Sequence, residues 1–254
     1  MAFATDELTK RCMEQKGFPF NTVSPNELPP ESQNDQWGID DVSVAREHGY
    51  GLSEKDFWEN WVDPNYGYLS SLSPDDRARW ELAFSGRWEN RIRLRLPNGA
   101  EFSMPGEGCN AGADRQVYGD LRKYLELRVA MMQIAPEVDQ RVAADPRYTS
   151  ALSVWRKCMR ENGYRFEQRA DAIAAAQAFY DSPGKTAADA RSGEISIAVS
   201  DARCAARAGV VRIAKQLERR YTRVLLGERE GQYAAWRELQ EQAVARAKRL
   251  LAQG

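Results

Sequence analysis

Histidine is nearly absent from this sequence, since His48 is the only one among 254 residues. A catalytic triad that needs histidine, or a metal site with several histidines, would have to be built around this one residue. His48 stands in the segment Glu-His-Gly-Tyr-Gly, whose glycines predict the end of a helix, and we interpret it as structural. We therefore expect no catalytic histidine, no metal site and no cofactor.

Long apolar runs, signature motifs and an excess of charge are also missing. No hydrophobic stretch approaches the length that spans a bilayer, so we expect no transmembrane segment. The sequence has no Walker A motif, no Gly-x-Gly-x-x-Gly, no His-Glu-x-x-His and no nucleophile elbow. The 36 basic and 37 acidic residues give a net charge of −1, so we expect no nucleic-acid partner.

The first residues, Met-Ala-Phe-Ala-Thr-Asp, lack the basic and apolar regions of a signal peptide. Two interpretations follow from this. The chain is either a cytoplasmic protein or the mature part of an exported protein whose leader lies outside this sequence.

The four cysteines stand in a repeated context. Residues 10–20 and 156–166 each contain a basic pair, Cys-Met, a glycine five residues after the cysteine, and then aromatic-x-Phe. Each copy predicts a helix that ends at the glycine in a left-handed conformation, with the next aromatic side chain folded back on the last turn. Wide cysteine spacing and a single histidine do not fit a zinc site.

The other two cysteines share a weaker motif, Cys-x-Ala-x-Ala, at Cys109 and Cys204. A Cys-Met site followed by a Cys-x-Ala-x-Ala site therefore occurs twice along the chain. This order predicts the disulfides Cys12–Cys109 and Cys158–Cys204 among three possible pairings. The alternative is four buried free thiols, because free cysteine is among the most buried residue types.

The periodicity predicts a mainly α, disulfide-stapled protein. We expect an irregular aromatic-rich region at residues 1–118 and a bundle of long helices at 119–254, packed together as one continuous globule. A β-hairpin is predicted at residues 91–104, with a three-residue loop ending at a left-handed Gly99. Within the helical half, residues 182–193 are predicted to be a loop.

Two sets of side chains are candidates for binding. The aromatic residues of one loop-rich stretch suit contacts with sugars or proteins: Trp58, Trp61, Tyr66 and Tyr68. The arginines of one hairpin face suit the phosphates or carboxylates of a polymer: Arg91, Arg93 and Arg95. The alternatives are that the rings replace a regular core and that the arginines form a solvated face balanced by nearby glutamates.

Several short motifs resemble those of exported actinobacterial proteins of uncharacterised function. These are the repeated Cys-Met-x-x-x-Gly-aromatic motif, Asp-Ala-Arg-Cys at 201–204, Glu-His-Gly-Tyr-Gly-Leu at 47–52 and Tyr-Gly at 118–119. The resemblance implies a secreted or anchored protein, a leader or lipid anchor removed upstream, and oxidised cysteines. It carries over no catalytic residue.

From these patterns we expect a non-enzymatic, extracytoplasmic binding or interaction protein of the bacterial cell envelope. Its partner would be an unknown protein or a component of the cell wall. Two alternatives stay open: a cell-wall-directed hydrolase that uses a pair of carboxylates, and a cytoplasmic regulatory protein with free thiols.

Overall fold

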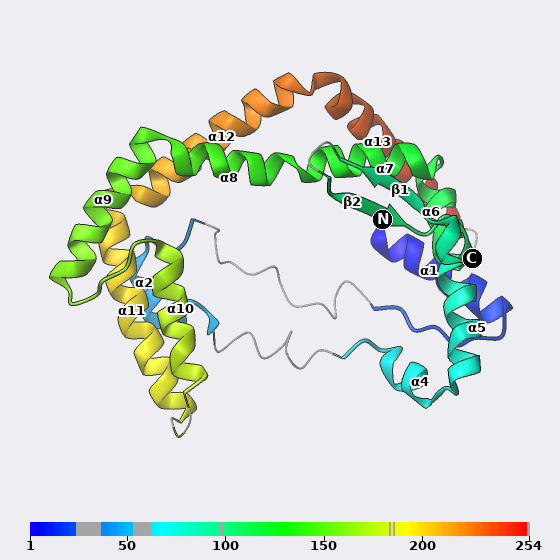
Figure 1. The fold of residues 1–254 in the computed structure, drawn as a ribbon, viewed down its shortest axis with the longest axis horizontal. Coiled ribbons are helices and arrows are strands. Elements are labelled where there is room, and N and C mark those ends of the chain that lie inside the picture. Colours follow the sequence, from blue (N-terminus) through cyan, green and yellow to red (C-terminus); the bar gives the residue numbers. More distant parts are fainter. Residues whose placement is uncertain (24–36, 53–61, 97–98, 183, 185, 253–254) are drawn as a thin grey trace. The chain divides into compact units, whose positions relative to one another are not determined.

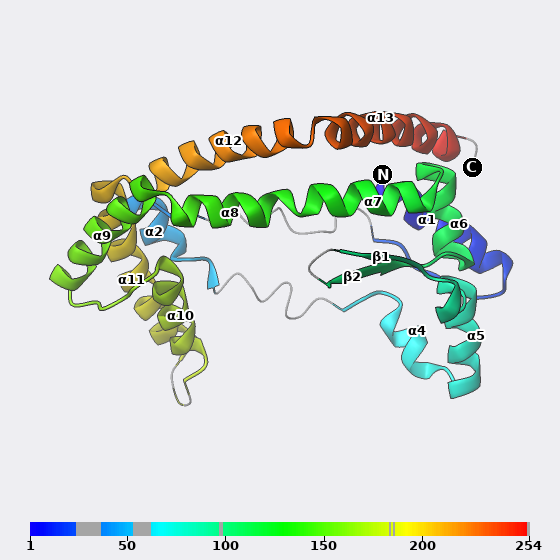
Figure 2. The same cartoon turned by 45° about the horizontal axis from the view of Figure 1, so that its top comes forward.

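In the computed structural model the protein is mainly helical, with one antiparallel hairpin and two disulfide bonds, as predicted (Figures 1 and 2). The structure describes residues 1–23, 37–52, 62–96, 99–182, 184 and 186–252. They form two compact units. Unit 1 includes Val62–Ile134 and both chain ends, and unit 2 includes Ala135–Leu225 together with the segment around residues 37–52. Each unit takes segments from both sides of residue 118.

Unit 1 is built around helix α6 (Gly108–Tyr118), which packs against four other helices. These neighbours are α1 (Ala2–Gln15), α5 (Pro74–Ser85), α7 (Leu121–Met132) and α13 (Glu230–Ala252). The unit also contains α4 (Tyr66–Ser71), the short 3-10 helix η3 (Trp88–Asn90), and strands β1 (Ile92–Arg95) and β2 (Glu101–Met104). Buried alanines where α1, α6 and α13 meet permit these helices to approach closely.

Local signals set the ends of the helices in unit 1. The Ser73 hydroxyl accepts a hydrogen bond from the Asp76 amide, and Pro74 occupies the first turn of α5. A second pair of signals separates α6 from α7. Gly119 ends α6 with φ +82°, and the carboxylate of Asp120 then caps α7.

The hairpin has the predicted register. Leu94 pairs with Phe102 and Ile92 pairs with Met104, so the apolar side chains share one face. This face packs in a hydrophobic cluster with Leu125 and other side chains of α7. Gly99 has φ +85° and donates its amide hydrogen to the Leu96 carbonyl, which confirms its predicted left-handed conformation.

Unit 2 is built around α11 (Ala187–Ala208), which packs against α2 (Val42–His48), α9 (Pro146–Glu161) and α10 (Arg169–Tyr180). Helix α8 (Ile134–Ala144) precedes α9, and α12 (Val210–Glu228) follows α11. The predicted loop at residues 182–193 is wrong in its second half, because Thr186 and Asp189 form a capping box that starts α11 at Ala187. Within α11, Gly193 lies directly against the Phe179 ring, where a Cβ would be 2.7 Å from a ring carbon.

The two Cys-Met segments end their helices in the same way. Gly17 and Gly163 have φ +83° and +87°, one in each unit. The amide of Phe18 donates to the Met13 carbonyl at 3.0 Å, and the equivalent bond from residue 164 to residue 159 is 2.9 Å. This is the Schellman pattern, in which the residue after the glycine reaches back to the last full turn. The predicted caps are therefore confirmed.

Both predicted disulfides are present, and they occupy equivalent positions in the two units. Cys12 of α1 is bonded to Cys109 of α6, and Cys158 of α9 is bonded to Cys204 of α11. In each unit the capped Cys-Met helix is thus linked to the helix at the centre. The methionine beside the first cysteine is fully buried in both units.

Candidate functional site

The largest cluster of buried polar side chains lies in unit 2 around Asp201 of α11, which is 1% exposed. Its Oδ1 accepts hydrogen bonds from Trp155 Nε1 at 2.7 Å and Arg169 Nε at 2.9 Å. Its Oδ2 accepts from the Tyr50 hydroxyl and from Arg169 Nη2, both at 2.9 Å. Because a carboxylate offers about four lone-pair positions, these four donors occupy its hydrogen-bonding capacity.

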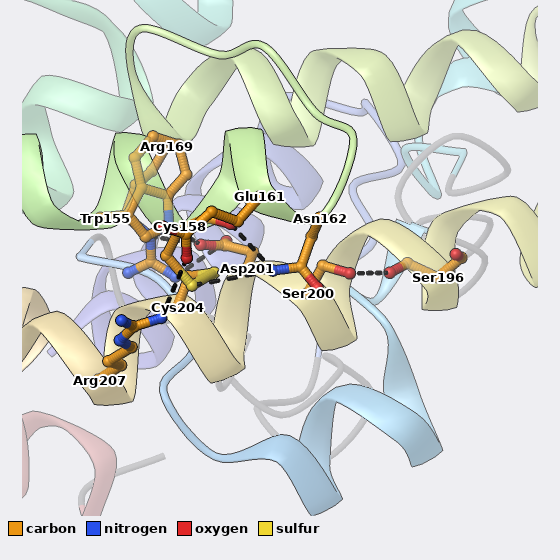
Figure 3. The surroundings of a disulfide bond; sticks show 10 residues. All are labelled: Trp155, Cys158, Glu161, Asn162, Arg169, Ser196, Ser200, Asp201, Cys204 and Arg207. Carbon is orange, nitrogen blue, oxygen red and sulfur yellow. Dashed lines mark hydrogen bonds and ion pairs between the residues drawn. A yellow bond between two sulfur atoms is a disulfide. The ribbon is translucent and has the colours of Figure 1, made fainter.

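The disulfide of unit 2 holds this cluster together. Trp155 precedes Cys158 by three residues on α9, and Asp201 precedes Cys204 by three residues on α11. Residues three apart lie on the same face of a helix. The bond between the two cysteines therefore holds the indole of one helix against the carboxylate of the other, and Figure 3 shows the two side chains directed toward each other.

Arg169 connects the cluster to the N-terminal segment of unit 2. Its side chain is 8% exposed and forms an ion pair with Asp201. It also donates hydrogen bonds to the carbonyls of Trp37 and Ile39, the second at 2.7 Å. The guanidinium is thereby used to fasten residues 37–39 to the start of α10.

Glu194 is a second fully buried acid on α11. Its Oε1 accepts hydrogen bonds from the amides of Tyr50 at 2.7 Å and Leu52 at 2.9 Å, and its Oε2 accepts from the Tyr180 hydroxyl. Gly49, with φ +61°, lies so close that a Cβ would be 2.6 Å from Glu194 Oε1. The Glu-His-Gly-Tyr-Gly-Leu segment therefore ends α2 and places the turn after it against a buried carboxylate.

Tyr50 connects the two acids, because its backbone amide donates to Glu194 and its hydroxyl donates to Asp201. Burial raises the pKa of the Tyr50 phenol, and the neighbouring Asp201 carboxylate raises it further. The hydroxyl therefore stays protonated and acts as a donor. His48, the last residue of α2, is exposed and lies beside Glu47, with 3.6 Å between Nε2 and Oε1.

Sequence reasoning missed Asp201, Glu194 and Arg169 as a group. Their signals were the two short motifs at 47–52 and 201–204, but the partners come from distant parts of the chain. The chemistry of the cluster is that of a structural clamp: Asp201 accepts four hydrogen bonds and Glu194 accepts three.

The predicted aromatic residues have different surroundings. Tyr66 of α4 is 62% exposed. Tyr68, also on α4, is partly buried in a hydrophobic cluster with Trp80 and Met13. Trp58 and Trp61 lie outside the described residues, so their part in a binding site stays a prediction.

The predicted arginines lie on the hairpin face that is opposite to the α7 contact. The guanidinium carbons of Arg91 and Arg93 lie 5.1 and 5.5 Å from the ring centre of Trp88. Arg95 follows on the same face and is exposed. Nothing in the sequence patterns connected Trp88 with these arginines.

Two neighbouring carboxyls of unit 1, Asp114 and Asp6, have raised pKa values. Burial raises the pKa of Asp114 on α6 to about 6, although Arg128 acts in the opposite direction, and nearby Asp6 of α1 raises it again. Burial also raises the pKa of Asp6, and the neighbouring Glu7 adds to this. A carboxyl with a raised pKa is what a general acid needs, so this pair is the candidate for hydrolase chemistry.

Among the described residues, no group of three or more His, Cys, Asp and Glu side chains could hold a metal ion. None of the described helices is long and apolar enough to cross a membrane. A shallow cavity of about 480 Å³ in unit 2 is lined mainly by apolar atoms of α9, Ala208 and Ile213. A smaller one of about 180 Å³ in unit 1 lies beside Tyr118, Lys123 and Arg246.

Comparison with known proteins assigns no activity to these groups. No protein-family model, no curated protein and no solved structure matches this chain.

Proposed function

We propose that this is a non-enzymatic binding or interaction protein that acts outside the cytoplasm, at the bacterial cell envelope. Its partner is a protein or a component of the cell wall. The proposal has three parts: the absence of catalysis, the compartment and the binding surface.

The absence of catalysis is argued from the contacts of the buried ionisable side chains. Asp201, Glu194 and Arg169 form hydrogen bonds that hold loops and helices together. A general base or nucleophile needs an accessible lone pair next to a substrate. The carboxylates of this cluster are buried and directed at protein donors, which fits a structural role.

The two disulfides support the second part. Disulfides persist mainly in oxidising compartments such as the bacterial periplasm and the cell surface. A pair of long-range disulfides, each joining two helices of one unit, is therefore compatible with an exported protein. The short motifs that resemble those of exported actinobacterial proteins support the same location.

Exposed aromatic side chains of unit 1 support the third part. Trp88 and Tyr66 keep 66% and 62% of their surface exposed. Large rings in water are unfavourable for a free protein but provide much of the energy of a binding contact. Their exposure therefore favours a surface that another molecule covers.

The experiment is co-sedimentation of the oxidised protein with purified bacterial cell walls. We expect the protein to bind without releasing soluble sugar or peptide fragments over several hours. Reduction of the disulfides should abolish binding, because it loosens both units. Failure of the oxidised protein to sediment with the walls would contradict the proposal in its cell-wall form.

The hydrolase alternative is favoured by one observation, the raised pKa of Asp114 next to Asp6. Under this alternative, wall fragments would accumulate with time, and Asp114→Asn would stop their release while the protein still binds. Asp120→Asn is the control, since this exposed carboxylate caps the next helix. Release that depends on Asp114 and not on Asp120 would replace the binding proposal.

A further inference from the structure

We propose that one surface of unit 1 binds an acidic polysaccharide, a polymer of sugar rings that carry carboxylate groups. The surface consists of Trp88, Arg91, Arg93 and Arg95 and is called the Trp88–arginine surface below. This inference rests on the proposed function, because it specifies the class of ligand that the binding protein takes.

Trp88 is the most exposed large hydrophobic residue described in the chain, at 66%. It belongs to η3, directly before β1, and its ring lies near two guanidinium groups at 5.1 and 5.5 Å. Guanidinium groups within about 6 Å of an indole are attracted to its electron-rich face. The ring is thus held in position although most of its surface is open to solvent.

The strand directs the arginines away from the protein core. Side chains alternate along β1, and Ile92 and Leu94 pack in the hydrophobic cluster with α7. Figure 2 shows the hairpin beside α7 within unit 1. Arg91, Arg93 and Arg95 therefore share the opposite face, next to the indole.

Much of the donor capacity of these arginines is unused. Arg91 donates hydrogen bonds from Nε to the Ser103 hydroxyl at 3.1 Å and from Nη2 to the Ser103 carbonyl at 3.3 Å. Arg93 donates one hydrogen bond, from Nη2 to the Trp88 carbonyl at 3.2 Å. Each guanidinium has five N–H groups, so donors remain on both. Arg95 has no hydrogen-bond or ion-pair partner among the described residues.

The charge of the surface is positive. Glu101 is the cross-strand carboxylate, and its Oε1 lies 3.6 Å from Arg93 Nε. Glu89 of η3 is also exposed. The surface therefore combines three guanidinium groups with two carboxylates.

These features match an acidic polysaccharide. Alternate residues of a strand lie roughly 6.6–6.8 Å apart, so the arginines form a row that can follow a polymer with regularly spaced anions. Guanidinium groups bind carboxylates through two parallel hydrogen bonds. The exposed indole offers an apolar plane on which the C–H face of a sugar ring can pack.

Two other classes of polyanion fit less well. Nucleic-acid-binding proteins usually show a strongly basic patch or domain, whereas this chain has a net charge of −1. An anionic membrane surface is attracted by clusters of several basic residues, while here two of the neighbouring residues are acidic. Two disulfides also favour a compartment where polysaccharides are abundant.

The test measures binding of the oxidised protein to defined probes by isothermal titration. The probes are polygalacturonate, which has rings and carboxylates, dextran, which has uncharged rings, and polyglutamate, which has carboxylates without rings. We expect binding to polygalacturonate and at least tenfold weaker binding to the other two polymers. Single-stranded oligonucleotide and phosphatidylglycerol vesicles are included as competing classes.

Variants assign the binding to the surface. Trp88→Ala should weaken polygalacturonate binding about 30-fold, as expected for a central aromatic anchor. Arg95→Gln should weaken it about tenfold and reduce its dependence on salt. Arg237→Gln is the control, because it removes one charge from an exposed pair on α13, 3.5 Å from Glu241. All three variants should keep the parent melting temperature, since each side chain is exposed.

If Arg95→Gln and Arg237→Gln reduced the affinity for polygalacturonate equally, the inference would be overturned, because the effect would then be one of overall charge. Stronger binding of the oligonucleotide or of the vesicles than of polygalacturonate would also overturn it. If cell walls bind the protein but polygalacturonate does not, the inference is wrong and the proposed function stands. If the oxidised protein binds neither cell walls nor polygalacturonate, both the proposed function and the inference are contradicted.

Discussion

The removal of the Asp201 carboxylate is the sharpest test of the clamp in unit 2. Asp201→Ala leaves the Arg169 guanidinium, 8% exposed, without its buried counter-charge. It also deprives the Trp155 indole and the Tyr50 hydroxyl of their acceptor. Breaking one partner of a buried ion pair typically costs 3–5 kcal/mol. We expect a loss of about 4 kcal/mol in the unfolding free energy of unit 2.

Milder variants separate the charge from the hydrogen bonds. Tyr50→Phe removes one of the four donors and should cost about 1.5–3 kcal/mol, the range for hydrogen bonds to charged groups. Arg203→Ala changes an exposed side chain of the same helix and should stay within about 0.5 kcal/mol of the parent. In the double variant Arg169→Met with Asp201→Leu, stability should exceed that of Asp201→Leu alone, because no unpaired charge remains.

Hydrogen exchange measured by mass spectrometry resolves the two units. Peptides from α9 and α11 report the opening of unit 2, and peptides from α1 and α6 report unit 1. In Asp201→Ala, the protection of amide hydrogens should fall in α9 and α11 and persist in α1 and α6. If Asp201→Ala lowered the unfolding free energy of unit 2 by less than about 1 kcal/mol, the reasoning would be refuted. The Arg169 guanidinium would then have found another partner.

Three further predictions concern backbone strain, covalent linkage and pH. Gly99→Ala should lower the free energy of unfolding by about 1 kcal/mol, because only the left-handed φ of +85° disfavours alanine there. Gly49→Ala should lower it at least twice as much, because the added Cβ would meet the buried Glu194 carboxylate. Urea unfolding measures both changes. Replacing Cys158 and Cys204 by serine should destabilise unit 2 by about 4 kcal/mol in the same assay, for a loop closed over 46 residues. Asp114 has a folded-state pKa of about 6 against 3.8 as its ordinary value, so its contribution to stability is present below pH 3.8 and is lost as the pH rises through 6. Asp114→Asn should therefore gain stability relative to the parent between pH 4 and pH 7 in melting experiments, and a constant difference would contradict the burial of this carboxyl.

The sequence alone determined those features that depend on neighbouring residues. The glycine caps at Gly17 and Gly163 follow from a helix that must end and an aromatic residue that can fold back. The hairpin register follows from alternation, because a shift by one residue would move every apolar side chain to the wrong face. The disulfide pairing followed from the repeated order of two motifs. The caps and the register depend on signals within about ten residues of chain, whereas the pairing depended on the order of motifs along most of it.

Only the tertiary structure decided the buried clamp and the exposure of individual rings. Tyr50 and Asp201 are 151 positions apart, and nothing local at either residue specifies the other. Tyr68 and Trp88 are both aromatic residues of the same region, yet one packs on Trp80 and the other stays 66% exposed. Burial depends on what packs against a side chain, and the way the helices come together decides this, not the residues directly beside it in the sequence.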